Sequence, residues 1–300
     1  MDQHVTQTPV ITQEMFNLFD DYIHSSMRSS PMPRRTFMRR LAKLAGSSAA
    51  AATIAPMFDC NYAVAETIKA DDPRLDAQWV TYKGMSGDVK AYLVKPKNVT
   101  KAGAIVVAHE NRGLNPHIQD VTRRFAVDGF VALGVDFMSQ LGGTPPTEAE
   151  AMPLFAKMEA PKAVGDGVAA VQYLKSHANS NGKVGAVGFC WGGGMVNQIA
   201  VNSPDLTAGV AYYGVQPKAE DAAKVKAKLM LQYAALDERI TSGGPAWVDA
   251  LKANKVDVQS FVYPNAQHAF NNDTSPDRYN PEVAKLAWDR TIEFFKKNLA

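Results

Sequence analysis

A single cysteine between glycines constrains the fold of this chain more than any other feature. Residues 188–192 read Gly-Phe-Cys-Trp-Gly, and the cysteine comes just after the apolar run from Val184 to Phe189. A strand that enters a helix through one residue must turn sharply, and flanking glycines remove the Cβ atoms that would clash there. The segment therefore predicts a nucleophile elbow with Cys190 at its apex. The first backbone N–H groups of the following helix have no partner within it, so we expect one to face an oxyanion beside the sulfur.

Short apolar runs alternate with amphipathic stretches along the rest of the chain. Their spacing predicts an antiparallel hairpin first and then a mostly parallel sheet with helices on both faces, which is an α/β fold. Glycines and prolines between residues 139 and 160 favour a loop or partial lid. The expected extended runs are 78–83, 89–95, 104–108, 130–135, 184–189, 206–213, 228–233 and 256–263, and the expected helices are 118–127, 163–177, 193–201, 245–253 and 281–297. The inward positions expected for the last helix are Val283, Leu286, Ala287, Ile292 and Phe295.

The first 65 residues read as a targeting segment rather than as part of the fold. Residues 33–40 carry two arginine pairs and precede a small, apolar stretch at 41–57, which resembles a twin-arginine export signal. Residues 63–65 read Ala-Val-Ala, a pattern typical of signal cleavage. We therefore expect a leader at 1–65, a single domain at 66–300, the twin-arginine export machinery as a partner, and a periplasmic or exported location. The alternative is an amphipathic N-terminal helix that carries two arginine pairs.

Cysteine usage fits an exported protein with one special thiol. Cleavage after Ala65 would remove Cys60 and leave Cys190 as the only cysteine. No disulfide bond within the mature chain is therefore expected, although the compartment would permit one.

Charge and composition argue against several classes of partner. The 300 residues carry a formal net charge of only +2, and basic residues gather only in the leader, so we expect no nucleic acid partner. Lys43 and Gly46 interrupt the apolar stretch of the leader, and we expect no stable membrane span in the mature chain. His109 and His117 have neither a cysteine nor a close set of carboxylates beside them, and no phosphate loop or dinucleotide fingerprint is present. We expect no metal and no cofactor.

Two further residues complete a catalytic set in the order nucleophile, acid, base. Asp237 follows the run 228–233, and His268 follows the run 256–263. Because the carboxyl ends of parallel strands meet at one edge of a sheet, both can lie beside Cys190. A cysteine thiol ordinarily has a pKa near ~8.5, so a base is needed to form thiolate at neutral pH. We expect His268 to accept the thiol proton and Asp237 to orient the imidazole.

These motifs resemble the dienelactone hydrolase (carboxymethylenebutenolidase) family of α/β-hydrolases, whose elbow carries cysteine in place of serine. The resemblance spans residue 76 to the C-terminus and is carried by residues 109–114, 188–194, 236–240 and 267–270. It implies the α/β-hydrolase fold and a glutamate beside the thiol that takes part in its deprotonation, here Glu110. It also implies an oxyanion hole formed by the backbone N–H groups of Asn111 and Trp191. A second interpretation of Glu110 is a surface charge or an ion-pair partner of Arg112.

One departure from the family pattern concerns the substrate. Members of the family hold a substrate carboxylate with arginines, one of them a few residues beyond the histidine, whereas residues 269–276 contain no arginine. Arg112, Arg239 and Arg278 are the alternatives, and the sequence does not rank them. The identity of the lactone therefore stays open.

The function expected from these residues is hydrolysis of a small ester or lactone through a thioester acyl-enzyme intermediate on Cys190. A peptide or acyl-peptide hydrolase of the same fold is one alternative, less favoured because the mature chain leaves little room for a large cap domain. The other alternative is a non-catalytic exported binding or thiol-sensing protein in which Cys190 is oxidised reversibly.

Overall fold

The computed structural model describes residues 12, 14–15, 18, 21–22, 32–54 and 66–300. The chain divides into two compact units, Met1–Cys60 and Asn61–Ala300, and each is described by itself. The larger unit holds every residue that the sequence singles out for catalysis.

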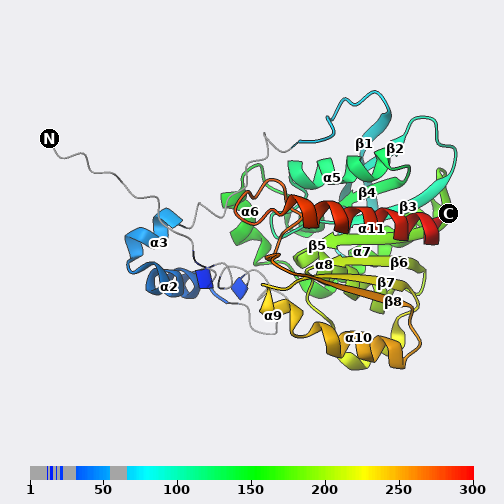
Figure 1. The fold of residues 1–300 in the computed structure, drawn as a ribbon. Helices are drawn as coiled ribbons and strands as arrows, with labels where there is room; N and C mark the ends of the chain where they lie inside the picture. Colours follow the sequence, from blue (N-terminus) through cyan, green and yellow to red (C-terminus); the bar gives the residue numbers. More distant parts are fainter. Residues whose placement is uncertain (1–11, 13, 16–17, 19–20, 23–31, 55–65) are drawn as a thin grey trace. The chain divides into compact units, whose positions relative to one another are not determined.

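An eight-stranded sheet forms the centre of the larger unit (Figure 1). Its strand order is β1-β2-β4-β3-β5-β6-β7-β8. β2 pairs antiparallel with both β1 and β4, and all the remaining neighbours pair in parallel. The strands are β1 (Leu75–Gly84), β2 (Gly87–Pro96), β3 (Ala102–Ala108), β4 (Val131–Val135), β5 (Ser180–Phe189), β6 (Leu206–Tyr212), β7 (Lys228–Ala234) and β8 (Val258–Tyr263). The predicted hairpin and mostly parallel α/β sheet are confirmed.

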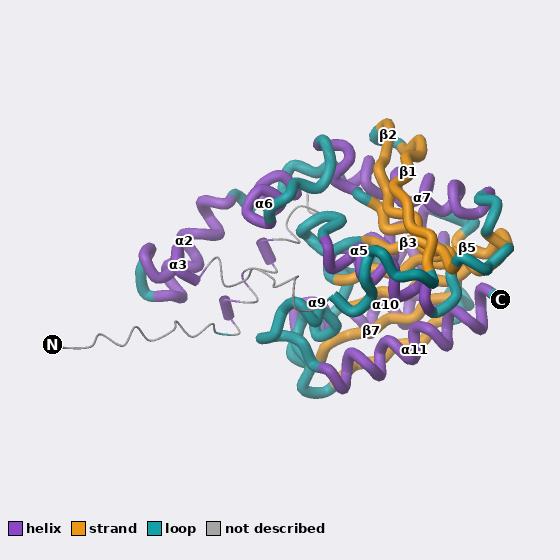
Figure 2. The backbone as a smooth tube through the Cα atoms, turned by 90° about the horizontal axis from the view of Figure 1, so that it is seen from above, coloured by secondary structure: helices purple, strands orange, loops and turns teal. Residues whose placement is uncertain are grey.

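Helices cover both faces of this sheet. On one face lie α5 (Pro116–Val127) and α11 (Pro281–Leu299), where the ring centroids of Phe125 and Phe295 are 6.2 Å apart. α7 (Ala160–Ser176) and α8 (Trp191–Asn202) lie on the other face, and Figure 2 shows α7 and α11 on opposite sides of the strands. Shorter elements of the unit include η4 (Ala219–Lys224), α9 (Glu238–Thr241) and α10 (Gly244–Ala253).

The central strands are buried along almost their whole length. Every residue of β4 is buried, and so is every residue of β3 after Ala102. Helices on both faces explain why these parallel strands read as continuous apolar runs. Their carboxyl ends open into loops at one edge of the sheet, which is where an α/β fold of this kind presents polar side chains.

The segment expected to be a loop or partial lid contains two short helices instead. These are η3 (Phe137–Leu141) and α6 (Glu148–Phe155), and α7 already begins at Ala160. The hydroxyl of Thr147 accepts a hydrogen bond from the N–H of Glu150 at 3.4 Å and donates one to the Glu150 carboxylate at 2.8 Å. Thr147 is therefore the N-cap of α6, which forms although Pro153 lies within the helix.

One inward position expected for the last helix is wrong. Leu286 is 45% exposed, while the buried side of α11 includes Ala284, Ala287 and Thr291. These three positions are spaced by three and four residues, and Leu286 falls outside the stripe that they define.

The smaller unit contains α2 (Arg34–Ala45) and α3 (Ser48–Ile54) in its described part. Phe37 and Leu41 are buried, and the ring of Phe37 stacks on Tyr22 with centroids 4.6 Å apart. Cys60 and the cleavage pattern at 63–65 lie outside the described residues, and export stays a prediction. None of the helices found in the described ranges combines the length and the apolar character that crossing a membrane requires.

Candidate active site

Cys190 lies at a sharp turn between β5 and α8. Its backbone has φ 58° and ψ −119°, which non-glycine residues rarely adopt. A Cβ on Gly188 would lie 2.1 Å from the carbonyl oxygen of Gly192, and a Cβ on Gly192 would lie 2.3 Å from that of Ala108. Glycine is therefore the residue that fits at both positions, and the elbow packs directly against the end of β3. The cysteine itself is buried.

Asp237 and His268 form a hydrogen-bonded pair at the carboxyl edge of the sheet. Asp237 lies between β7 and α9, and His268 lies in the loop after β8. Nδ1 of His268 is 2.6 Å from Oδ2 of Asp237, and both side chains are buried. Burial acts to raise the pKa of Asp237, but the charge and hydrogen bond of His268 and the charge of Arg239 lower it below its ordinary value. Asp237 is therefore an anion, and it fixes the imidazole with its Nδ1–H toward the carboxylate.

Tyr213 connects this pair with the elbow. It directly follows β6, and the centroid of its ring lies 4.9 Å from that of His268. Burial raises the pKa of Tyr213, and the charges of Glu110 and Cys190 raise it further. The backbone N–H of Cys190 donates to the backbone oxygen of Tyr212 at 3.1 Å, so the elbow and the imidazole both adjoin this end of β6.

The loop after β3 begins with a structural histidine. Nδ1 of His109 donates to the backbone oxygen of Glu110 at 2.5 Å, and its Nε2 accepts from the backbone N–H of Phe137 at 3.2 Å. Burial lowers the pKa of His109 although Asp136 opposes this. His109 is therefore a neutral residue that ties the end of β3 to the end of β4.

Glu110 is held by a neutral amide. Its Oε2 accepts a hydrogen bond from Nδ2 of Asn272 at 2.6 Å, in buried surroundings. The N–H and hydroxyl of Thr274 both donate to Oδ1 of Asn272, at 3.0 and 2.6 Å, and so fix the orientation of this amide. Asn272 lies in the segment 269–276, which contains no arginine although the family pattern has one a few residues beyond the histidine.

The loop after β3 and the start of α8 lie against each other. The missing Cβ of Gly192 would be 2.3 Å and 2.6 Å from the carbonyl oxygens of Ala108 and His109. Among the described residues, the backbone contacts outside regular elements include no hydrogen bond donated by the N–H of Asn111 or Trp191. Two donors on adjoining segments can stabilise a carbonyl oxygen that becomes negative.

The three candidate arginines have different surroundings. Nη1 of Arg112 lies 2.6 Å from Oε2 of Glu148, and both side chains are largely buried, so Arg112 forms an ion pair with Glu148. Nη2 of Arg239 lies 3.8 Å from Oδ1 of Asp237. Arg278 is buried, and its positive charge opposes the rise that burial causes in the pKa of Tyr213. Arg278 is therefore the arginine whose charge reaches Tyr213.

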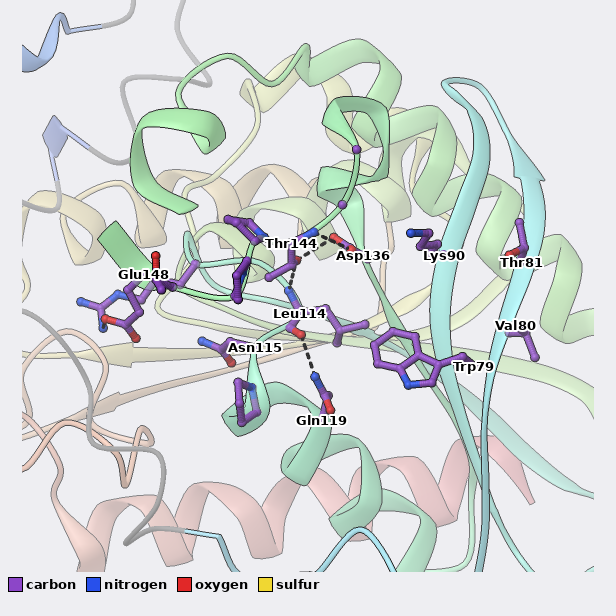
Figure 3. A pocket seen from close by; sticks show the side chains of 17 residues that line it. Trp79, Val80, Thr81, Lys90, Leu114, Asn115, Gln119, Asp136, Thr144 and Glu148 are labelled. Atoms are coloured by element: carbon purple, nitrogen blue, oxygen red, sulfur yellow. Dashed lines mark hydrogen bonds and ion pairs between the residues drawn. The ribbon is translucent and has the colours of Figure 1, made fainter. Parts of the chain in front are cut away.

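A pocket of about 680 Å³ is lined by residues of β1 and of the loops that follow β3 and β4 (Figure 3). Figure 3 places Glu148 and Trp79 on opposite sides of it, with Leu114 between them. Its other lining residues include Lys90, Arg112, Gln119, Asp136, Pro145 and Pro146. Cys190, Asp237 and His268 are not among the residues that line it, so of the predicted site residues it includes only Arg112.

Reasoning from the sequence missed Tyr213 and Asn272. Tyr213 ends the apolar run 206–213, at the carboxyl end of a central strand, and that position was a usable signal for a site residue. Asn272 gave no comparable signal, because its contact with Glu110 joins segments 162 positions apart.

Comparison with known proteins identifies the family. The sequence model of the dienelactone hydrolase family matches residues 89–299. The chain belongs to the dienelactone hydrolase family. It is therefore a hydrolase of the dienelactone hydrolase type, as the resemblance implied.

The similarity to relatives of this chain covers nearly the whole length of those proteins. A protein of Saccharolobus solfataricus named "Putative carboxymethylenebutenolidase" is 28% identical over 256 residues, which cover 73% of this chain and 97% of that protein. Protein usf of Aquifex pyrophilus is 32% identical over 232 residues, or 74% of this chain and 99% of that protein. The acylaminoacyl peptidase of Pyrococcus horikoshii shares the fold, with a TM-score of 0.60, 18% identity, and coverage of 80% of this chain and 44% of that chain.

Proposed function

We propose that this protein is a carboxylic ester hydrolase that cleaves a small ester or lactone through a thioester acyl-enzyme intermediate on Cys190. The observation that carries the proposal is the buried Asp237–His268 pair, 2.6 Å apart, at the edge of the sheet where the elbow ends. A thiol needs such a base because its ordinary pKa lies above neutral pH.

The proposed first half of the reaction acylates the sulfur. The thiol of Cys190 gives its proton to Nε2 of His268, and the sulfur attacks the carbonyl carbon of the substrate. The C=O electron pair moves to oxygen, where the N–H groups of Asn111 and Trp191 stabilise it by about 3 kcal/mol each. Asp237 stabilises the imidazolium. When the C–O bond breaks, the leaving oxygen takes the proton from His268.

The proposed second half hydrolyses the thioester. His268 takes a proton from water, and the resulting hydroxide attacks the thioester carbon. The C–S bond then breaks, the carboxylic acid leaves, and the sulfur recovers the proton from the imidazolium. The same base thus serves both halves in turn.

Glu110 and Arg278 have supporting roles in this proposal. Glu110 takes part in the deprotonation of the thiol, whose proton goes to His268, and the amide of Asn272 holds the Glu110 carboxylate at 2.6 Å. Arg278 is the proposed partner for a negatively charged group on the substrate, because its charge reaches Tyr213.

We also propose that the enzyme is periplasmic and is delivered by the twin-arginine export machinery. Lysines in place of Arg34 and Arg35 should then leave the protein in the cytoplasmic fraction. Unchanged recovery from the periplasm would contradict this location.

Replacing the sulfur tests the proposed nucleophile directly. The Cys190→Ala variant should lose turnover of aryl esters and lactones while its unfolding temperature stays close to that of the wild type. Ester hydrolysis at the wild-type rate by this variant would end the proposal.

A peptide or acyl-peptide hydrolase is the second candidate, favoured by the fold shared with acylaminoacyl peptidase. This chain spans 44% of that protein, so the likeness concerns only part of it. A screen of amino-acid amides against aryl esters and lactones separates the two candidates. Faster turnover of the amides would favour the peptidase.

A further inference from the structure

The hydroxyl of Tyr213 is a buried polar group that the mechanism above does not use. Tyr213 is 0% exposed, and no described residue forms a hydrogen bond with its hydroxyl oxygen. The neighbouring Tyr212 differs, since its hydroxyl lies 2.7 Å from Oγ1 of Thr291. A buried hydroxyl without a partner is unfavourable, so its retention at this position calls for a reason other than stability.

The backbone holds Tyr213 in a strained conformation. Its φ is 38°, in the left-handed region that aromatic residues avoid. The following Gly214 packs so closely on α8 that a Cβ there would lie 2.2 Å from the carbonyl carbon of Gly193. The N–H of Tyr213 also donates to the backbone oxygen of Gln232 at 2.7 Å. Surroundings that impose strain on one residue in this way are typical of functional sites.

The groups around this phenol are those of the proposed active site. Its ring lies 4.9 Å from that of His268. The backbone N–H of Cys190 donates to the backbone oxygen of Tyr212 at 3.1 Å, which sets the elbow against the residue that precedes Tyr213. Burial raises the pKa of Tyr213, the charges of Glu110, Cys190 and Tyr212 raise it further, and the charge of Arg278 opposes them. Tyr213 therefore keeps its proton and is a donor rather than a base.

We propose that Tyr213 is a further catalytic residue whose hydroxyl donates a hydrogen bond to the sulfur of Cys190 once the thiol has lost its proton. The inference rests on the proposed role of Cys190 as nucleophile. A neutral thiol is a weak acceptor, whereas a thiolate accepts strongly. The thiol proton goes to His268, and the phenol retains its own. Tyr213 is thus a donor placed beforehand where negative charge develops.

The Tyr213→Phe variant removes this hydroxyl and keeps the ring, and Tyr212→Phe is its matched control. In the full chain, the rate of alkylation of Cys190 by iodoacetamide is measured against pH. The Cys190 peptide is quantified by mass spectrometry, so that Cys60 does not contribute. The pH at which the alkylation rate reaches half of its maximum is the midpoint. In Tyr213→Phe this midpoint should rise by about one pH unit, so that the thiolate fraction at neutral pH falls about tenfold. In Tyr212→Phe the midpoint should not change.

The unfolding temperatures of the same two variants separate this role from a structural one. Tyr213→Phe should unfold at the wild-type temperature or above, because it loses an unbonded hydroxyl, whereas Tyr212→Phe should unfold at a lower temperature. An unchanged midpoint in folded Tyr213→Phe overturns the proposal. A wild-type midpoint at or above the ordinary thiol value of ~8.5 overturns it as well, whatever the variants do.

Alkylation of Cys190 needs no ester substrate. The proposed hydrolysis and the proposed role of Tyr213 can therefore fail independently of each other. If Cys190→Ala retained ester hydrolysis, the proposed function would fail, while the midpoint would still report whether Tyr213 stabilises the thiolate.

Discussion

Replacing Asp237 by asparagine removes one negative charge from the hydrogen-bonded Asp237–His268 pair and keeps its shape. In the wild type, Oδ2 of Asp237 lies 2.6 Å from Nδ1 of His268, and the two residues are 1% and 3% exposed. In the proposed transition state the imidazole is positive, and two opposite charges about 4 Å apart at an effective dielectric constant of about 20 attract by about 4 kcal/mol. Because about 1.4 kcal/mol corresponds to a factor of ten in rate, kcat/KM should fall roughly a thousandfold.

The assay is hydrolysis of an aryl ester by the wild type and by Asp237→Asn. Alkylation of Cys190 in both proteins checks that the elbow is intact in the variant. A loss of less than about tenfold, with a native unfolding temperature, would refute the reasoning, because the carboxylate would then contribute little to the stabilisation of the imidazolium.

The pH dependence of stability tests the same charge independently. Burial raises the pKa of Asp237, but His268 and Arg239 more than offset it, so the folded value is lowered. Ionised Asp237 then stabilises the fold fully above the unfolded pKa of about 3.9, and the contribution is lost as the pH falls through the lower folded value. The difference in unfolding temperature between the wild type and Asp237→Asn should therefore be largest near neutral pH and shrink in acid. A constant difference would contradict the assignment.

Two further predictions concern packing beside the site. Gly192→Ala places a Cβ 2.3 Å from a backbone oxygen of the neighbouring strand and should destabilise the fold by about 2–3 kcal/mol or more in urea unfolding, with loss of esterase activity. Gly129→Ala, whose Cβ would meet no atom within 4 Å, is the control and should cost only the roughly 1–2 kcal/mol of its left-handed backbone; equal losses in the two variants would be inconsistent with this account. Arg112→Met breaks a largely buried ion pair at 2.6 Å and should lower the free energy of unfolding by about 3–5 kcal/mol, because it leaves the carboxylate of Glu148 without this partner. Adding Glu148→Leu should restore much of that loss, and a single variant as stable as the wild type would show that the pair is not structural.

Much of the fold followed from local patterns in the sequence. β3 and β4 read as apolar runs because helices cover both of their faces. The elbow was readable because glycines are required at 188 and 192, where any Cβ would meet backbone atoms. Asp237 and His268 could be found because parallel strands bring their carboxyl ends to one edge.

The features that the sequence did not reveal depend on contacts between distant segments or on competing signals. α6 was missed because the prolines and glycines around it outweighed the N-cap at Thr147. The partner of Arg112 proved to be Glu148 on that same helix. The role of Asn272 required knowing that its loop returns to Glu110. The position of the Tyr213 side chain depends on a positive φ that the packing around it imposes.

Acylation of Cys190 is the central chemical claim, and intact-mass analysis tests it most directly. The full chain is mixed with an aryl ester or lactone, and the reaction is quenched in acid during turnover. The mass of the intact protein and the masses of its proteolytic peptides are then measured. We predict a mass increase equal to the acyl group, located on the Cys190 peptide and absent from the Cys190→Ala variant. Release of product with no acyl mass on that peptide, or the same adduct in the variant, would contradict the proposed mechanism.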